Sequence, residues 1–547
     1  MRTILAILLA GLIIDQLTEP IRVNVRLVEI NVVAFTRTGE PVTDLAKDDF
    51  EILDNGKPQE VRFFALEKQS LPSGTLDPLP KNVFSNRRLG AVKTAPGVSV
   101  VLFDLLNTEF ADQANAKKQL ISLLHKMQPG ERIGVYVLGR QVSVLHDFTD
   151  DPSQLAAVLA RFEGREFHEL TGATGDQQPR PVDLSATQGR FAEAEQLLNR
   201  AENVQRDYFN VDRVTVTLGA FRGIAERLAR QPGRKSLVWI SGSFPFTLGT
   251  TQKDLENLAK DSPNRERGSF QNLFDSAMRA VSDADIAIYP VDARGLIPST
   301  AYDASHSAGS EAVYSRKEEP NRALYSPPNI DSMENLANKS GGRAFFNTND
   351  LQQSISAALS DNRISYTLEF SPTSPPDDKF HVLKVQVRRK NVNLRYRQGY
   401  LASSKSSGLS DPTTMLKEAL GSPLDASAIG ITAKLEMPEF GSGAWNLTTT
   451  VDSHDLAIRE ENGKWVGHLQ VVYSVQAETG KELAGVLDNV SLDLKPEIWS
   501  KISAEGLILR KEFRPPGNAA KVRIAIYDVA TGRVGSISVP LGQRPAS

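Results

Sequence analysis

Residues 98–103 (VSVVLF) form the feature that most constrains the fold, a short and nearly continuous apolar run that stops at Asp104. A strand that is apolar on both faces is typical of the middle of a parallel sheet, where helices cover each side. Asp104 then stands at the carboxyl end of that strand, which is where open α/β sheets place their ligands. We therefore expect an α/β domain built around this strand, over residues 97–361.

The chain after Asp104 alternates between short apolar runs and amphipathic helical patterns. The predicted strands lie at residues 132–138, 236–240, 286–291 and 343–346, with a short antiparallel partner at 141–145. The predicted helices lie at residues 111–126, 153–161, 216–230, 270–282, 333–340 and 351–359. Residues 163–200 and 298–328 show no clear period, and we interpret them as an insertion of mixed order and a loop. This alternation predicts a doubly wound, mostly parallel sheet of the Rossmann type.

Strand patterns with alternating apolar and polar residues flank the α/β unit on both sides. Residues 18–65 contain the hairpin signal Asn55-Gly56, and residues 362–402 contain three further strand patterns. Their matching alternation predicts that the two segments pair in one β-sandwich into which the α/β domain is inserted. The polar stretches 66–96 and 403–413 are interpreted as linkers, and residues 414–547 as a second, C-terminal β-sandwich.

The N-terminal residues 1–17 have the pattern of a secretory signal peptide, although a first strand of the fold is the alternative. One early positive charge precedes the apolar run Ile4–Ile14, which is shorter than the roughly 20 residues that span a bilayer. We expect export to the periplasm, the cell surface or the medium. No other segment is apolar enough to cross a membrane, so an integral membrane protein is not expected after signal removal.

Composition and motifs argue against several classes of function. The net charge of -3 provides no electrostatic footprint for nucleic acid, and the absence of cysteine excludes disulfides, thiolate metal sites and thiol nucleophiles. The seven histidines are scattered, and G-x-S-x-G, H-E-x-x-H and P-loop motifs are missing. Gly341-Gly342 is interpreted as a helix C-cap, and Ser241-Gly242-Ser243 has no assignable base. The sequence therefore predicts a protein that is not an enzyme.

Asp104–Thr108 is the one stretch with candidate metal chemistry. A carboxylate followed within four residues by amide and hydroxyl oxygens suits a hard divalent cation such as Mg²⁺. Such a cation keeps several waters and an open coordination position, through which it recruits a carboxylate from a partner.

Several segments in order resemble a von Willebrand factor A domain. They are Asp104–Thr108 after the first strand, residues 132–138, the helix after Thr215 and Thr217, residues 235–243 and residues 336–345. The flanking patterns at residues 42–56 and 366–400 are similar to those of exported, bacterial VWFA-related proteins of the acidobacterial type. The resemblance covers roughly residues 22–402 and implies a non-catalytic domain that binds protein partners.

The resemblance also implies the ligands of a metal-ion-dependent adhesion site, of the form D-x-S-x-S with a Thr and an Asp on later loops. Asp104 matches the first Asp, Thr108 the second Ser, and either Thr215 or Thr217 the second-loop Thr. Leu106 replaces the first Ser, and Ser241-Gly242-Ser243 stands where the final Asp belongs, a position that Asp292 does not match. The site is expected to be degenerate: no cofactor is expected, and Mg²⁺ or another divalent cation would bind at low affinity at most.

Two functions follow from these patterns. The first is an exported module for protein binding or cell adhesion, whose partner is a protein or a component of the extracellular matrix or envelope. The alternative is a carbohydrate-binding or cell-envelope scaffold protein that acts through the C-terminal sandwich. A row of aromatic side chains on that sandwich would favour the alternative, and Trp445, Trp465 and Trp499 are available for it.

Overall fold

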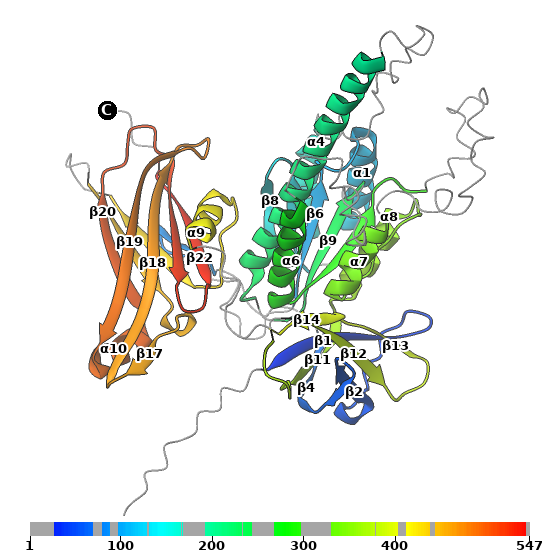
Figure 1. The fold of residues 1–547 in the computed structure, drawn as a ribbon, viewed down its shortest axis with the longest axis horizontal. Helices are drawn as coiled ribbons and strands as arrows, with labels where there is room; N and C mark the ends of the chain where they lie inside the picture. The colour runs from blue at the N-terminus through cyan, green and yellow to red at the C-terminus, as the bar shows by residue number, and fades with distance from the viewer. Residues whose placement is uncertain are drawn as a thin grey trace, which may run out of the picture.

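The computed structural model describes residues 27–68, 79–87, 97–127, 131–165, 167, 192–231, 233–242, 267–296, 330–377, 379–402, 412–437 and 444–542. They form a central α/β domain, an N-terminal β domain at one end of its sheet, and a C-terminal β-sandwich beside its helix α4 (Figure 1). The predicted signal peptide, residues 1–17, lies outside the described residues. Among the helices that the structure describes, none combines the length and apolar character needed to cross a bilayer.

The α/β domain contains a five-stranded sheet in the order β10-β9-β6-β7-β8. Its strands are β6 (Val98–Asp104), β7 (Arg132–Leu138), β8 (Val142–Thr149), β9 (Lys235–Ser241) and β10 (Ile286–Asp292). Strands β10, β9, β6 and β7 are parallel, and β8 is antiparallel at one edge. The strand predicted at residues 343–346 is reduced to one parallel bridge, between Phe345 and Val291. Counted along the chain the order is 5-4-1-2-3, so the strand order reverses between β6 and β9.

Helices cover both faces of this sheet, which explains why its inner strands are apolar throughout. One face packs against α1 (Phe110–Lys126), α2 (Pro152–Arg161) and α8 (Leu351–Ser360). The other packs against α4 (Ala192–Leu228), α6 (Arg267–Asp283) and α7 (Ile330–Ser340). Every residue of β6, β9 and β10 is buried. Helix α7 ends in the predicted C-cap, where Gly341 has a φ of +82° and the Gly342 amide donates to the Ala337 carbonyl.

Helix α4 is much longer than the helix predicted at residues 216–230. The interpretation of residues 163–200 as mixed in order is wrong for residues 192–200, which belong to this helix. The amino-terminal part of α4 projects beyond the sheet (Figure 1). The sequence carries no clear period there, so its pattern did not predict a helix.

The N-terminal domain is made of strands from both sides of the α/β domain. Its two sheets have the orders β13-β1-β11-β4 and β14-β12-β2-β3. The strands are β1 (Val28–Thr36), β2 (Phe50–Asp54), β3 (Lys57–Gln59), β4 (Val61–Lys68), β11 (Ile364–Phe370), β12 (Phe380–Val387), β13 (Val392–Arg395) and β14 (Gly399–Leu401). Strand β11 pairs with β1 and β4, which brings the two ends of the α/β domain together. The Asn55-Gly56 hairpin has the expected positive φ values, 48° and 79°.

The C-terminal domain is a sandwich whose two sheets enclose one apolar core. One sheet has the order β20-β16-β15-β5; in the other, β18 pairs with β17, β19 and β21, and β21 with β22. The strands are β5 (Val83–Ser85), β15 (Ile431–Glu436), β16 (Trp445–Val451), β17 (Arg459–Glu461), β18 (Lys464–Gln476), β19 (Glu482–Leu494), β20 (Leu507–Phe513), β21 (Lys521–Asp528) and β22 (Val534–Pro540). Two helices, α9 (Pro412–Gly421) and α10 (Pro496–Glu505), complete the domain.

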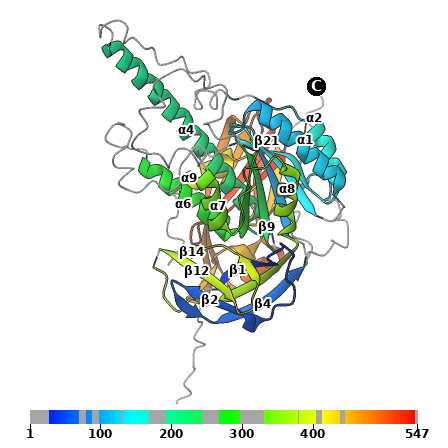
Figure 2. The same ribbon diagram turned by 90° about the vertical axis from the view of Figure 1, so that its right-hand side faces the viewer.

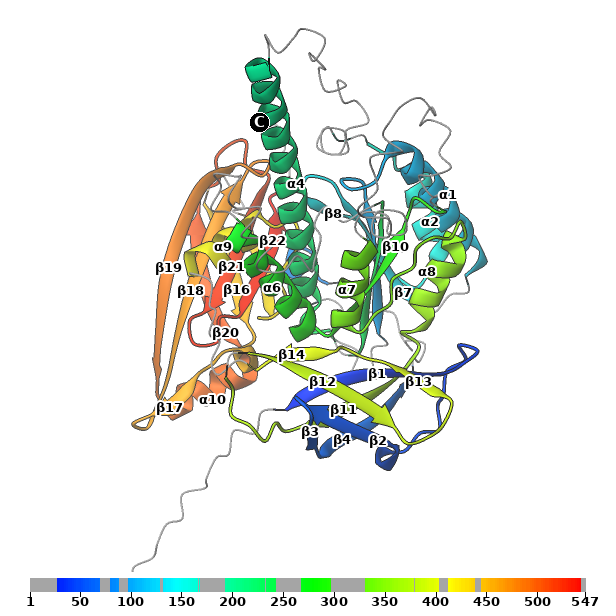
Figure 3. The same ribbon diagram turned by 45° about the vertical axis from the view of Figure 1, so that its right-hand side comes forward.

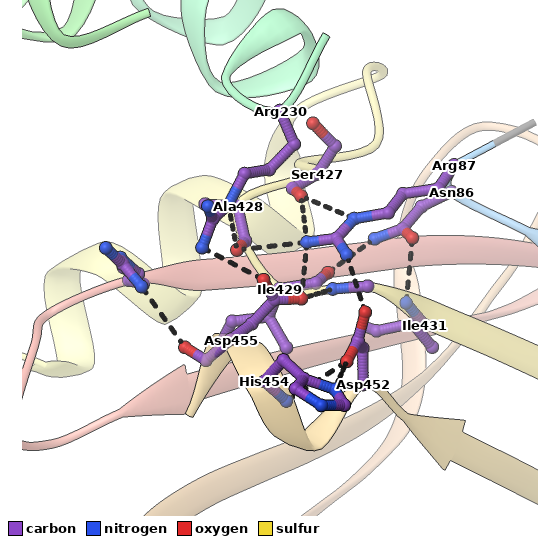
Figure 4. Close-up of polar contacts among 12 residues, drawn as sticks. Asn86, Arg87, Arg230, Ser427, Ala428, Ile429, Ile431, Asp452, His454 and Asp455 are labelled. Carbon is purple, nitrogen blue, oxygen red and sulfur yellow. Dashed lines mark hydrogen bonds and ion pairs between the residues drawn. The ribbon is translucent and has the colours of Figure 1, made fainter. Parts of the chain in front are cut away.

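The interpretation of residues 66–96 as a linker is wrong at residues 66–68, which belong to β4. It is also wrong at residues 83–85. They form β5, which pairs with β15 of the C-terminal domain. Arg87 follows β5 and forms ion pairs with Asp452 at 3.0 Å and Asp455 at 2.5 Å, and Arg230 reaches Asp455 at 2.9 Å (Figure 4). Three residues are too few to show an alternating pattern, so only the partner strand reveals β5. The predicted linker 403–413 is also shorter, since α9 begins at Pro412.

The two β domains contact different parts of the α/β domain (Figures 2 and 3). At the amino ends of the parallel strands, Arg234 donates to the carbonyl of Asn31 in β1. Along α4, the Ser427 amide donates to the Glu226 carbonyl, and Arg222 pairs with Glu418 at 2.5 Å. These contacts lie away from the carboxyl ends of the strands, where Asp104 stands.

Candidate functional site

Asp104 is the last residue of β6, the middle strand of the sheet, at the point where the strand order reverses. Ser241 ends the neighbouring strand β9, and its hydroxyl donates to Asp104 at 2.9 Å. The Gly242 amide donates to the Thr108 hydroxyl at 2.9 Å. The expected neighbourhood of Asp104, Ser241 and Gly242 is therefore confirmed, while Ser243 lies outside the described residues.

Protein donors bond to both oxygens of the Asp104 carboxylate. Oδ1 accepts from the Asn107 amide at 3.0 Å. Oδ2 accepts from Asn107 Nδ2 at 2.8 Å, from Trp239 Nε1 at 2.9 Å and from Ser241 Oγ. A carboxylate oxygen has two lone pairs, so these three bonds saturate Oδ2, while Oδ1 has one protein donor. Burial raises the pKa of Asp104, and the hydrogen bonds from Asn107, Trp239 and Ser241 oppose that rise.

The structure distinguishes the two threonines that the sequence left open. Thr217 is buried; its Oγ1 accepts from Asn107 Nδ2 at 2.9 Å and donates to the Arg213 carbonyl at 2.8 Å. Thr215 is exposed, and its hydroxyl donates to the Val211 carbonyl within α4. Residues two apart on a helix point about 200° from each other, so only one of them can face Asp104. Asp104, Thr108 and Thr217 come together, and Thr215 does not join them.

Arg213 is the site residue that the sequence analysis missed. It is buried, one turn before Thr217 on the same face of α4, and its Nε donates to Asn107 Oδ1 at 2.9 Å. Burial lowers the pKa of Arg213 to about 10, and the nearby Asp104 charge opposes that fall. The spacing of four residues to Thr217 is the one signal that could have identified it. Trp239 was also missed, because its N–H donates to Asp104, a residue of the neighbouring strand β6 that lies far away in the chain.

Leu106, which replaces a motif Ser, and Asp292, which does not match the position of the final Asp, both lie apart from the Asp104 oxygens. Leu106 is fully buried and belongs to the apolar core between the sheet and α4. Asp292, at the end of β10, forms a two-point ion pair with Arg294, whose Nε and Nη2 donate to it at 2.9 and 2.8 Å. Neither residue contributes an oxygen to the Asp104 neighbourhood.

These residues, as arranged, do not fit a divalent cation. Mg²⁺ and similar ions require about six oxygen ligands, several of them water. Here N–H and O–H groups of the protein occupy the oxygens of Asp104, Thr108 and Thr217. Within the described part of the chain, no group of three or more His, Asp or Glu side chains is placed to hold a metal ion.

The tryptophans of the C-terminal domain do not form one exposed row. Trp445 is buried in the sandwich core. Trp465 of β18 and Trp499 of α10 are half-buried and stack on each other, with ring centroids 4.9 Å apart and planes 20° apart. Each of these two rings therefore has one face covered by the other.

Comparison with known proteins gives only distant likenesses. No protein-family model and no curated protein matches the sequence. An aerotolerance-related membrane protein from Bacteroides fragilis is 13% identical over 48% of this chain and 99% of that chain, with a TM-score of 0.25. BatB from Bacteroides thetaiotaomicron is 12% identical over 49% of this chain and 98% of that chain, also at 0.25. A von Willebrand factor type A protein from Catenulispora acidiphila is 9% identical over 88% of this chain and 74% of that chain, at 0.23. At these TM-scores the likenesses carry no argument, and function has to be argued from the geometry.

Proposed function

We propose that this chain is an exported, non-catalytic interaction module. It binds a protein of the envelope or matrix through its α/β domain, which resembles a von Willebrand factor A domain. The observation that carries the proposal is a pair of large apolar side chains exposed where parallel strands end. Phe110, six residues after the end of β6, is 56% exposed, and Leu296, four residues after β10, is 55% exposed. Together with Glu109 and Asp112 we call these residues the carboxyl-end face.

The carboxyl-end face combines apolar surface with negative charge. Glu109 is exposed and Asp112 is half-buried beside it. Burial raises the pKa of Asp112, and the charges of Glu109 and Asp292 raise it further. Phe110 and Leu296 follow β6 and β10, two strands with β9 between them that end at the same edge of the sheet. Exposed apolar surface rimmed by polar groups marks interaction sites. The chemistry fits a protein partner that presents an apolar side chain next to lysine or arginine.

A non-catalytic role accords with the burial and hydrogen bonding of Ser241 and Asp104, which lie behind this face. The Ser241 hydroxyl is fully buried and donates to Asp104, so it is not available as a nucleophile. Asp104 is buried and accepts four protein hydrogen bonds, so its carboxylate does not face a substrate. The buried polar atoms support the fold of the carboxyl-end face, which itself meets the partner.

The test is affinity capture from envelope and extracellular fractions with the full chain as bait, followed by titration calorimetry with each captured protein. The double variant Phe110→Asp, Leu296→Asp is expected to lose the partner. A matched control, Val486→Asp, Leu487→Asp, changes residues that are 46% and 53% exposed on β19 of the C-terminal domain, and it is expected to keep the partner. Loss of binding in the control alone would move the interaction to the C-terminal sandwich and refute the proposal.

Export is part of the proposal and has its own test. Cell fractionation and sequencing of the mature N-terminus are expected to find the chain outside the cytoplasm, with the first residues removed. A cytoplasmic protein that keeps Met1 would contradict it. The carbohydrate-binding alternative has less support, because Trp465 and Trp499 stack on each other and Trp445 is in the core.

A further inference from the structure

The buried guanidinium of Arg213 gives the Asp104 site a positive charge of its own. We infer that Arg213 supplies from within the chain the charge that a divalent cation supplies at metal-dependent sites of this kind, and that it closes the site to metal. The inference concerns the site itself and does not require that a partner be known.

A single amide joins the two buried charges. Asn107 Oδ1 accepts from Arg213 Nε at 2.9 Å, and Asn107 Nδ2 donates to Asp104 Oδ2 at 2.8 Å. The guanidinium thus polarises the amide in the direction that strengthens its bond to the carboxylate. Either ion alone in this interior would be strongly destabilising, because a buried charge needs an opposite charge or a full set of hydrogen bonds. Asp104 has an opposite charge nearby and four hydrogen bonds, all supplied by the chain.

The same arrangement works against a metal ion in two ways. A divalent cation on Asp104 would lie about one amide group from a guanidinium, and like charges in a buried site repel strongly. At Oδ2 it would also have to displace the three N–H and O–H donors of Asn107, Trp239 and Ser241, so that only Oδ1 could accept it without loss of a hydrogen bond. The geometry therefore stabilises the carboxylate without metal and penalises the metal-bound state.

Leu106 explains how Arg213 reaches this position. Leu106 packs in the same apolar core as Val214 and Leu218, which flank Arg213 and Thr217 along α4. Leu106 therefore packs against α4 at the position where a serine would coordinate a cation. The leucine at residue 106 and the buried position of Arg213 are thus two parts of one arrangement.

The test measures the response to Mn²⁺ of the full chain, by titration calorimetry and by the shift of the thermal midpoint. The wild-type protein is expected to show no saturable heat and no shift up to millimolar Mn²⁺. Arg213→Met removes the guanidinium at similar length and is expected to gain a Mn²⁺-dependent rise of its thermal midpoint. The double variant Asp104→Asn, Arg213→Met is expected to lose that response.

Two control variants keep the result interpretable. Arg222→Met removes a different arginine of α4, which is half-buried and paired with Glu226 and Glu418. It is expected to leave the Mn²⁺ response at the wild-type level. Arg213→Lys keeps a positive charge and is expected to stay insensitive to Mn²⁺, which provides a measurement if Arg213→Met does not fold. Micromolar Mn²⁺ binding by the wild type that Asp104→Ala abolishes would overturn the inference. So would an Arg213→Met protein that folds, keeps wild-type stability and ignores Mn²⁺.

One consequence rests on the proposed function, namely that partner binding survives a chelator. The failures of the two ideas are distinguishable. Binding that the Phe110 and Leu296 variants abolish but that also requires metal would preserve the carboxyl-end face and refute the role of Arg213. A wild type that takes no Mn²⁺, beside an Arg213→Met variant that does, would uphold Arg213 whether or not a partner is found.

Discussion

Asp455 is the carboxylate on which the attachment of β5 and α4 to the C-terminal sandwich depends. Its side chain is 6% exposed and accepts from Arg87 at 2.5 Å, from Arg230 at 2.9 Å and from the Gly430 amide at 3.0 Å. Figure 4 shows Arg87, Arg230 and Asp455 converging from three segments far apart in the chain. Arg533 lies close as well; burial and the charge of Arg230 lower the pKa of Arg533, and the Asp455 charge raises it. We predict that Asp455→Ala releases β5.

The size of the effect follows from what the substitution leaves behind. Removing one member of a buried ion pair costs about 3–5 kcal/mol, since the remaining charge stays without a partner. Arg87 and Arg230 keep 22% and 39% of their side chains exposed, and Arg87 also keeps its contact with Asp452, so partial hydration offsets some of the loss. We therefore expect the lower end, about 3 kcal/mol, which corresponds to roughly a hundredfold change in the local opening equilibrium.

Native-state hydrogen exchange measures this opening directly. The Asn86 amide, which donates to the Ile431 carbonyl at 3.1 Å beside β5, is expected to lose about two decades of protection. The matched control is Asp493→Ala, which breaks an exposed pair with Lys464 in the same domain and is worth at most about 1 kcal/mol. If Asn86 is protected equally in both variants, Asp455 does not hold β5 in place and the reasoning fails.

Three further predictions concern the α/β domain. Leu106→Ser places a serine at the first Ser position of the D-x-S-x-S motif and brings a hydroxyl into the apolar core. We expect it to lower the unfolding free energy by about 3 kcal/mol in urea titrations and to gain no Mn²⁺ response. Unchanged stability with tighter Mn²⁺ binding would contradict this. Burial raises the pKa of Tyr136 to about 12, so stability is expected to fall between pH 10, near the unfolded value, and pH 12; an equally steep fall in Tyr136→Phe would rule Tyr136 out as the cause. Gly342→Ala would place its Cβ 1.9 Å from the Ile288 carbonyl oxygen, and a loss of about 3 kcal/mol or more is expected in thermal unfolding; a folded variant with wild-type stability would show that the backbone can move there.

The candidate site shows where reasoning from sequence ends. The apolar run 98–103 was enough to place Asp104 at the end of a buried central strand, since burial on both faces leaves no polar position until the strand stops. The donors around Asp104 were not accessible in the same way. Thr217 lies 110 residues from Asn107 in the chain and Trp239 lies 135 from Asp104, and their pairing depends on how α4 and β9 pack.

The sequence by itself determined the elements whose residues respond to burial or to backbone geometry. The apolar strands, the Asn55-Gly56 hairpin and the Gly341-Gly342 cap belong to this class, because each is fixed by nearest neighbours and by the φ values that a residue tolerates. Only the tertiary structure decided that residues 83–85 complete a distant sheet and that Arg213 faces Asp104. A three-residue strand and a single buried charge are stabilised by partners far away in the chain, so no local sequence pattern predicts them.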